Sequence, residues 1–177
     1  VIEFMLSAHK GQKRKATGLP YAVHPIDVLS FLSLELKVNS ITCWKAEVAH
    51  DILEDCPTVS FETLKSKIGE DSAAIVQDLT FVPDEKLQVP SRLQKEEYIR
   101  SFCSKSVESL VIKIADRICN TNDFFLTNPD YAPKYWKQAN FLFEQVDVRK
   151  DEIVEKFGHS THFQLIYCIE RMKDLLK

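Results

Sequence analysis

The sequence predicts an all-α fold. Apolar residues recur at three- and four-residue steps, as at Ile41, Trp44, Val48 and Ile52, and this spacing places side chains on one face of a helix. The 177 residues include only four glycines and show little strand-like alternation, which argues against a sheet. We therefore expect a bundle of helices.

Three helices are expected in the first half of the chain. The apolar stripe predicts one over 41–52. A second is expected over 61–68, because Ser60 is a favourable N-cap and Gly69 a favourable ending residue. The chain then continues as a short helix over 72–80.

The second half is predicted to be helical as well. The stretch 81–97 contains prolines and charges, and we interpret it as a loop leading into a helix near Gln94. It is either a plain surface connection or a segment flanking a cleft. A strong apolar stripe predicts a buried core helix over 106–118, and two more helices are expected over 131–147 and 162–176.

Composition points to an ordinary globular protein. The length favours one domain over 1–177, and 45% of residues are hydrophobic and 28% charged. The net charge of −3 gives no general attraction to nucleic acid, and there is no apolar run suited to a membrane span. The five cysteines are scattered, without a C-x-x-C pair, so we expect reduced thiols and a cytoplasmic location. The oligomeric state cannot be assigned.

The most informative stretch is His50-Asp51-Ile52-Leu53-Glu54-Asp55. A histidine beside an aspartate offers a divalent metal one nitrogen and one oxygen ligand. On a helix, Glu54 shares a face with His50, and Asp55 shares one with Asp51. Taken alone, the stretch is equally consistent with a charged strip on a solvated helix.

Two further motifs favour the metal site. His24 lies in Pro20-Tyr21-Ala22-Val23-His24-Pro25, and Asp116 lies near the end of the core helix, in Ala115-Asp116-Arg117. With His50 and Asp51 they make a mixed nitrogen and oxygen set, which suits manganese, iron or zinc in a catalytic role better than a closed thiolate site. Glu54 and Asp55 are then placed to handle protons during catalysis.

The order His24, His50-Asp51, Asp116 resembles the H…HD…D pattern of the HD phosphohydrolase superfamily. The segments Ala8–Lys15, Pro20–Pro25, His50–Asp55 and Ala115–Asn120 are similar to the hydrolase domain of RelA/SpoT-type alarmone enzymes. This resemblance runs from about Val1 to at least Asn140.

The resemblance implies a fold and an activity. The fold is an HD-domain helical bundle, and the activity is Mn²⁺-dependent hydrolysis of the 3′-pyrophosphate of (p)ppGpp, the nucleotide of the stringent response. The products are GDP or GTP and pyrophosphate. The length suggests a stand-alone small alarmone hydrolase. Alternatives are another nucleotide substrate (NADPH, at its 2′-phosphate, or an adenosine alarmone) and a non-catalytic nucleotide-sensing module.

The resemblance also implies substrate contacts. Arg14 matches the family arginine near the base, Lys15 a phosphate contact, and Asn120 the asparagine that hydrogen-bonds the sugar. A solvated helix end is the alternative reading of the basic run around Arg14. We expect Arg117 to brace the metal site through an acidic neighbour.

Three residues depart from the usual family pattern A-D-R-L-H-N-M-R-T. Cys119 stands in place of the histidine, and Asn122 and Asp123 in place of the arginine and the threonine. These changes remove a positive charge and add a negative one near the sugar and phosphates. They bear on the identity of the substrate and leave the expected metal ligands intact.

Overall fold

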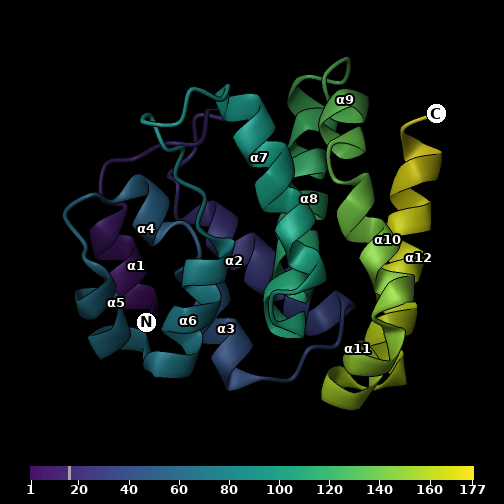
Figure 1. Ribbon diagram of the computed structural model, residues 1–177, viewed down its shortest axis with the longest axis horizontal. Coiled ribbons are helices and arrows are strands. Elements are labelled where there is room, and N and C mark those ends of the chain that lie inside the picture. Colours follow the sequence, from purple (N-terminus) through teal and green to yellow (C-terminus); the bar gives the residue numbers. More distant parts are fainter. Residues whose placement is uncertain (16) are drawn as a thin grey trace.

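The computed structural model describes residues 1–15 and 17–177 and is helical throughout most of them (Figure 1). In chain order the helices are α1 (Ile2–Ala8), α2 (Val23–Ser30), the π-helical turn η1 (Phe31–Glu35), α3 (Ile41–Val48), α4 (Ile52–Asp55), α5 (Phe61–Ile68), α6 (Glu70–Leu79), α7 (Ser91–Arg100), the 3₁₀ turn η2 (Ser101–Cys103), α8 (Val107–Thr127), α9 (Ala132–Lys137), α10 (Asn140–Val148), α11 (Lys150–Phe157) and α12 (His159–Leu175). Within the described residues, the only β-type pairing is an isolated bridge between Lys13 and Pro20. The predicted all-α fold is therefore confirmed.

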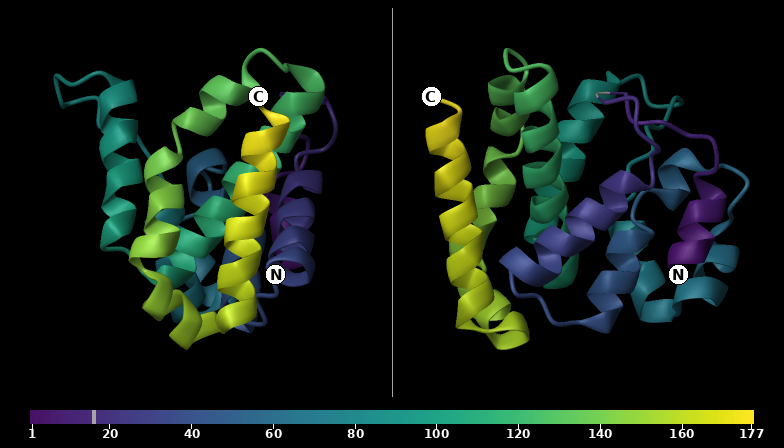
Figure 2. Two further views of the ribbon diagram at one scale, coloured as in Figure 1. Left: turned by 90° about the vertical axis from the view of Figure 1, so that its right-hand side faces the viewer. Right: turned by 180° about the vertical axis from the view of Figure 1, so that it is seen from behind.

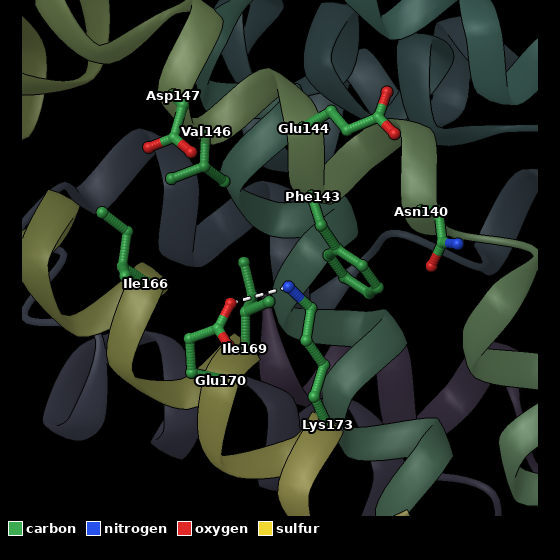
Figure 3. Close-up of a pocket in the computed structure, with 9 residues that line it drawn as sticks. All are labelled: Asn140, Phe143, Glu144, Val146, Asp147, Ile166, Ile169, Glu170 and Lys173. Carbon is green, nitrogen blue, oxygen red and sulfur yellow. Dashed lines mark hydrogen bonds and ion pairs between the residues drawn. The ribbon is translucent and has the colours of Figure 1, made fainter.

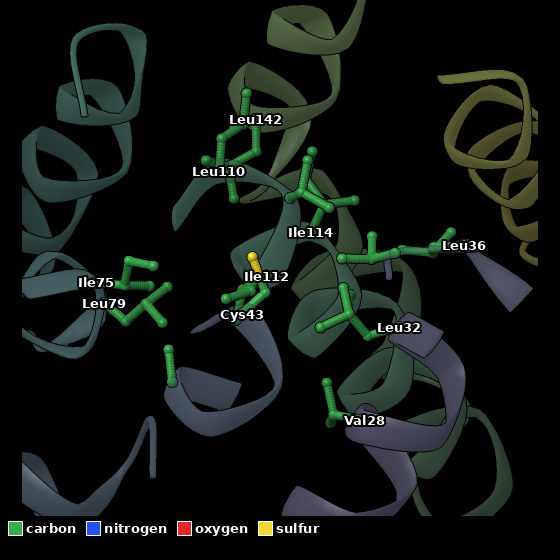
Figure 4. Close-up of a cluster of buried hydrophobic side chains, with 14 of the residues drawn as sticks. Val28, Leu32, Leu36, Cys43, Ile75, Leu79, Leu110, Ile112, Ile114 and Leu142 are labelled. Carbon is green, nitrogen blue, oxygen red and sulfur yellow. The ribbon is translucent and has the colours of Figure 1, made fainter. Parts of the chain in front are cut away.

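Helix α8 lies at the centre of the molecule, with α1 and α5 toward one end and α12 at the other (Figures 1 and 2). It contacts α2, α3 and α6 on one side and α9, α10, α11 and α12 on the other. Its side chains Leu110, Ile112 and Ile114 are fully buried, and Figure 4 shows them among apolar side chains from both groups of helices. Burial on several faces explains why this stripe is the strongest in the sequence.

The core helix is longer than predicted. It was expected over 106–118, but α8 continues to Thr127. Asp116 and Asn120 therefore lie within the helix and not at its end. Its start agrees with the prediction, because the Ser106 side chain caps it by accepting from the backbone N–H of Ser109 at 3.1 Å.

The C-terminal helices differ from those predicted. The helix expected over 131–147 is divided into α9 and α10, where the N–H of Ala139 bonds the carbonyl of Trp136 at 2.9 Å. The helix expected over 162–176 begins earlier, at His159. It is preceded by α11, which the sequence analysis missed. Gly158, at φ 88°, ends α11 and starts α12 within one residue, a conformation that favours glycine.

Two other expectations are confirmed with small shifts. Ser60 and Gly69 cap α5 at the predicted positions. The helix expected near Gln94 is α7, which begins at Ser91 after Pro90. No helix in the described part of the chain has the length and apolarity needed to cross a bilayer.

The 41–52 stripe forms a shorter helix than expected. Ser40 caps α3, and the helix ends at Val48. His50 and Asp51 follow in a turn, and α4 begins at Ile52. The prediction that both residues lie on a continuous helix was wrong, because residues 49–51 form a turn between α3 and α4.

Candidate metal centre and adjoining cavity

The four predicted metal ligands come from three separate parts of the chain and meet beside α8. His24 lies in the first turn of α2, His50 and Asp51 lie in the turn after α3, and Asp116 lies midway along α8. Both imidazoles and Asp116 are buried.

The distances between these side chains fit a shared ion. One ligand atom each from His24, His50 and Asp51 lie within 4.8 Å of one another. Asp116 Oδ1 is 3.1 Å from His24 Nε2 and 3.9 Å from His50 Nε2. Two nitrogens and up to two carboxylates thus face one small volume.

The orientation of His50 tests whether these residues suit a metal. Its Nδ1 donates to the backbone carbonyl of Glu47 at 2.8 Å, which leaves Nε2 as an acceptor in the neutral ring. That Nε2 is buried without a hydrogen-bond partner and lies 2.8 Å from Asp51 Oδ2. Two acceptors held so close need a proton or a cation between them, so the donor set fits a divalent metal.

Glu47 is a further acid at the centre that the sequence analysis did not identify. Its side chain is 0% exposed, and its Oε1 lies 3.2 Å from His50 Nδ1. Neither carboxylate oxygen has a hydrogen-bond partner among the described residues. Glu47 lies on α3, and nothing in the sequence distinguishes it from other helical glutamates except its position three residues before His50.

The acids and imidazoles shift one another's charge states. Burial lowers the pKa of His50, but Asp51 and Glu47 raise it by more, so the net shift is well upward. Burial raises the pKa of Asp116, whereas Lys113, at 3.2 Å, and His24 bring it well below its usual range. The Asp116 carboxylate is therefore held ionised, as a metal ligand requires.

Tyr21 was not predicted as a site residue, yet it contacts the candidate ligand Asp51 directly. Its hydroxyl donates to Asp51 Oδ2, and its ring stacks on His9 with centroids 4.5 Å apart. The motif around His24 contains Tyr21, but an aromatic residue in a turn has too many ordinary roles to be singled out. The hydrogen bond orients the carboxylate that faces His50.

The two predicted catalytic acids lie on α4, one turn beyond the candidate ligands. Glu54 accepts a hydrogen bond from the backbone N–H of Phe81 at 2.6 Å. Desolvation raises the pKa of Glu54, against the opposing effect of Lys113. Desolvation and then Asp51 also raise the pKa of Asp55. Acids with raised pKa values beside a metal site suit proton transfer near neutral pH.

A cavity of about 600 Å³ adjoins the metal centre. Its lining combines basic, aromatic and amide side chains: Gln12, Lys13, Arg14, Lys15, Tyr21, Asp55, Lys95, Asn120 and Phe124. The structure thus brings all three predicted substrate residues to one cavity. Lys95 on α7 and Phe124 on α8 were missed, because only the folded arrangement of these helices brings both side chains to the cavity.

Hydrogen bonds connect this cavity to the metal centre. Arg14 Nη2 donates to Asn120 Oδ1 at 2.9 Å and forms an ion pair with Asp123. The Asn120 amide in turn donates to Asp116. The backbone N–H of Arg14 donates to the carbonyl of Leu19 at 2.8 Å, and the N–H of Gly18 donates to the carbonyl of Arg14 at 2.8 Å, which holds the arginine in place.

Arg117 does not have its expected role. No carboxylate lies within ion-pair distance of it in the described part of the chain, so it does not brace the metal site through an acid. Its guanidinium lies instead over the ring of Tyr135, 4.1 Å from the centroid.

A second cavity, of about 280 Å³, lies between α10 and α12 (Figure 3). The ion pair of 2.6 Å between Glu170 and Lys173, both on α12, lies along one wall of this cavity. It shares no lining residue with the metal centre or with the cavity beside it, so we do not include it in the site.

Comparison with known proteins identifies the family. Residues 2–149 match the HD domain, and the matched segment contains all four candidate ligands and both candidate acids. The chain belongs to the HD-domain family.

Several HD-domain relatives are alarmone hydrolases by name. The chain is 32% identical over 130 residues to guanosine-3′,5′-bis(diphosphate) 3′-pyrophosphohydrolase MESH1 of Danio rerio, covering 73% of this chain and 69% of the relative. It is 33% identical over 143 residues to the enzyme of the same activity from Aquifex aeolicus, covering 80% of this chain and 20% of that longer protein.

A solved HD-domain structure shares the fold. It superposes with a TM-score of 0.73 at 22% identity and covers 96% of this chain and 92% of its own. It is described as a metazoan ortholog of SpoT that hydrolyses ppGpp. The predicted HD-type helical bundle is therefore confirmed.

Proposed function

We propose that this protein is a metal-dependent pyrophosphohydrolase that removes the 3′-pyrophosphate of (p)ppGpp. The observation that carries the proposal is the convergence of His24, His50 and Asp51 beside a basic cavity. The family match and the activity named for its relatives support the same reaction.

The metal would be held by His24, His50, Asp51 and Asp116, with manganese as the ion we expect. When bound, a divalent cation lowers the pKa of water and polarises phosphorus. The chain's own contribution is to orient the ligands. Tyr21 fixes Asp51 from one side, and the Glu47 carbonyl fixes the ring of His50.

Glu54 and Asp55 would transfer the protons. The attacking water must lose a proton, and the leaving oxygen must gain one. Because their pKa values are raised, either carboxylate can exchange a proton closer to neutral pH than a free side chain can. We assign Glu54 and Asp55 jointly to these two steps.

The cavity would hold the rest of the nucleotide. Arg14 presents a planar cation beside Tyr21, at 6.0 Å from that ring's centroid, and guanidinium planes stack on bases. Lys15 and Lys13 add positive charge for phosphates. Asn120 lies between the metal centre and Arg14, which is where a sugar would lie.

The proposal also includes one domain over 1–177 and a cytosolic location, as the composition and scattered cysteines suggest.

A nucleotide panel tests the function. Manganese-loaded protein is incubated with ppGpp, pppGpp, ppApp or NADPH, and products are separated by chromatography. We expect pyrophosphate and GDP from ppGpp. Glu54→Gln should lower kcat by roughly 10²–10⁴-fold while leaving metal bound, whereas Glu62→Gln, an exposed acid on α5, should change nothing. Tight nucleotide binding without product would indicate a sensing module. Phosphate release from NADPH alone would indicate the other substrate.

A further inference from the structure

Arg117 is a buried cation without a matching anion. Its side chain is 2% exposed, and no described carboxylate lies within ion-pair distance. Its Nε has no hydrogen-bond partner in the described residues, and Nη1 reaches only the Tyr135 carbonyl, at 3.5 Å. Burying an unpaired charge is costly, so such a group normally has a partner.

A small cavity beside Arg117 can hold that partner. Its volume is about 150 Å³, and it is lined by Arg92, Lys95, Glu96, Ile99, Arg117 and Gln138. At ~30 Å³ per water molecule this is room for about five waters, which is enough for a phosphate group.

The charges in this cavity favour an anion. Three of the lining side chains are cations, and the single acid, Glu96, is paired with Arg92 at 3.5 Å. Lys95 has no carboxylate partner among the described residues. Partial desolvation and then the nearby charge of Arg117 lower the pKa of Lys95, so the two cations repel each other. A bound dianion would relieve that repulsion.

Position connects the small cavity to the larger one. Lys95 lines both cavities, and Arg117 directly follows the candidate ligand Asp116 on α8. The small cavity is therefore next to the space that we assign to the nucleotide, on the side formed by α7.

We propose that the cavity lined by Arg92, Lys95 and Arg117 is a second phosphate-binding site, distinct from the metal centre. Arg117 would meet two phosphate oxygens with its planar fork, and Lys95 would act as a point charge. The ligand is a phosphoryl group, either of free phosphate or pyrophosphate or of the bound nucleotide. The inference extends the proposed function, but its test needs no turnover.

The test measures anion binding by calorimetry, with metal-free protein and inorganic phosphate or pyrophosphate as the probe. We expect saturable binding that Arg117→Gln weakens roughly tenfold or more, since hydrogen bonds to charged groups are strong. Arg92→Gln should weaken anion binding a few-fold. Because the Arg92 side chain is 83% exposed, this variant should fold normally, and it tests the site even if Arg117→Gln misfolds. The matched control is Arg171→Gln, at an exposed arginine of α12 that lines neither cavity, and it should leave binding unchanged. Arg14→Gln reports on the larger cavity, because Arg14 lines that cavity and not the small one.

Competition identifies the source of the phosphoryl group. If ppGpp displaces pyrophosphate from the metal-free protein, the site takes a phosphate of the nucleotide. If both bind together, it takes the free anion. Either result supports the site. Absence of saturable binding, or weakening by Arg14→Gln but not by Arg92→Gln or Arg117→Gln, would overturn it. If the protein binds pyrophosphate in the small cavity but does not hydrolyse ppGpp, only the proposed function is refuted.

Discussion

The guanidinium of Arg14 forms an ion pair with the carboxylate of Asp123, which lies 109 residues further along the chain. The contact ties the loop before α2 to the central helix α8, at the edge of the proposed substrate cavity. Asp123 is also one of the residues that departs from the family pattern. Its negative charge therefore acts first on Arg14, the residue proposed to meet the base.

Replacing Asp123 with asparagine should tighten nucleotide binding. The change removes an anion from a basic cavity and frees the Arg14 guanidinium to contact the nucleotide. Partly exposed pairs are worth about 0–1 kcal/mol, so we expect a gain of up to about fivefold in the affinity for ppGpp. Calorimetry on metal-free protein measures it without turnover.

Asp130→Asn is the control for this prediction. Asp130 is exposed, and its substitution changes the net charge by the same amount. It should leave the affinity unchanged. Weaker binding in Asp123→Asn would show that the ion pair holds Arg14 in its binding position.

Replacing Glu47 with leucine should lower the affinity for the metal without lowering the stability of the fold. The variant loses the carboxylate that lies 3.2 Å from His50 Nδ1. Partners of this kind behind a ligand histidine typically contribute 10–100-fold to metal affinity. We expect a loss near tenfold, because the backbone carbonyl still accepts from Nδ1. The melting temperature should not fall, because a buried, poorly paired carboxylate contributes little stability.

Manganese titration and thermal unfolding measure these two quantities. Glu47→Gln keeps an acceptor oxygen and should lose less affinity than the leucine variant. Equal metal affinity in all three proteins would contradict a role for Glu47 at the centre.

The raised pKa of Glu54 predicts a dependence of stability on pH. An acid whose pKa is higher in the folded than in the unfolded state stabilises the fold only while it is protonated. That contribution is lost as pH rises through the folded pKa. At pH 7 the ionised Glu54 should therefore cost stability, and metal-free Glu54→Gln should melt at a higher temperature than the parent protein.

The advantage of Glu54→Gln should shrink as the pH is lowered, because Glu54 then becomes protonated in both states. Scanning calorimetry from neutral to acidic pH checks this. A constant difference between the two proteins would mean that folding does not raise the pKa of Glu54. A less stable variant at pH 7 would mean that the hydrogen bond from Phe81 outweighs desolvation.

The candidate metal centre could be predicted because its residue types, two histidines and two aspartates, are typical metal ligands. His24, His50, Asp51 and Asp116 are residue types that can bind a metal, and their order along the chain could be recognised without knowing the fold. The central helix was also predictable, since an apolar stripe of that strength must be buried.

Residues that act through tertiary contacts were not predictable. Tyr21, Glu47 and Lys95 are of types common in any helix or turn, and only the folded arrangement brings them to Asp51, His50 and the cavity. The break at Gly158 was missed because α11 and α12 are separated by this one residue at positive φ. The sequence contains no loop of several residues that would have indicated the boundary.

The most direct test of the account is a crystal of this protein grown with Mn²⁺ and measured near the manganese absorption edge. We predict one strong anomalous peak within bonding distance of the Nε2 atoms of His24 and His50 and of carboxylate oxygens of Asp51 and Asp116. A map with no peak there, or with a peak at other side chains and either imidazole turned away, would contradict the account.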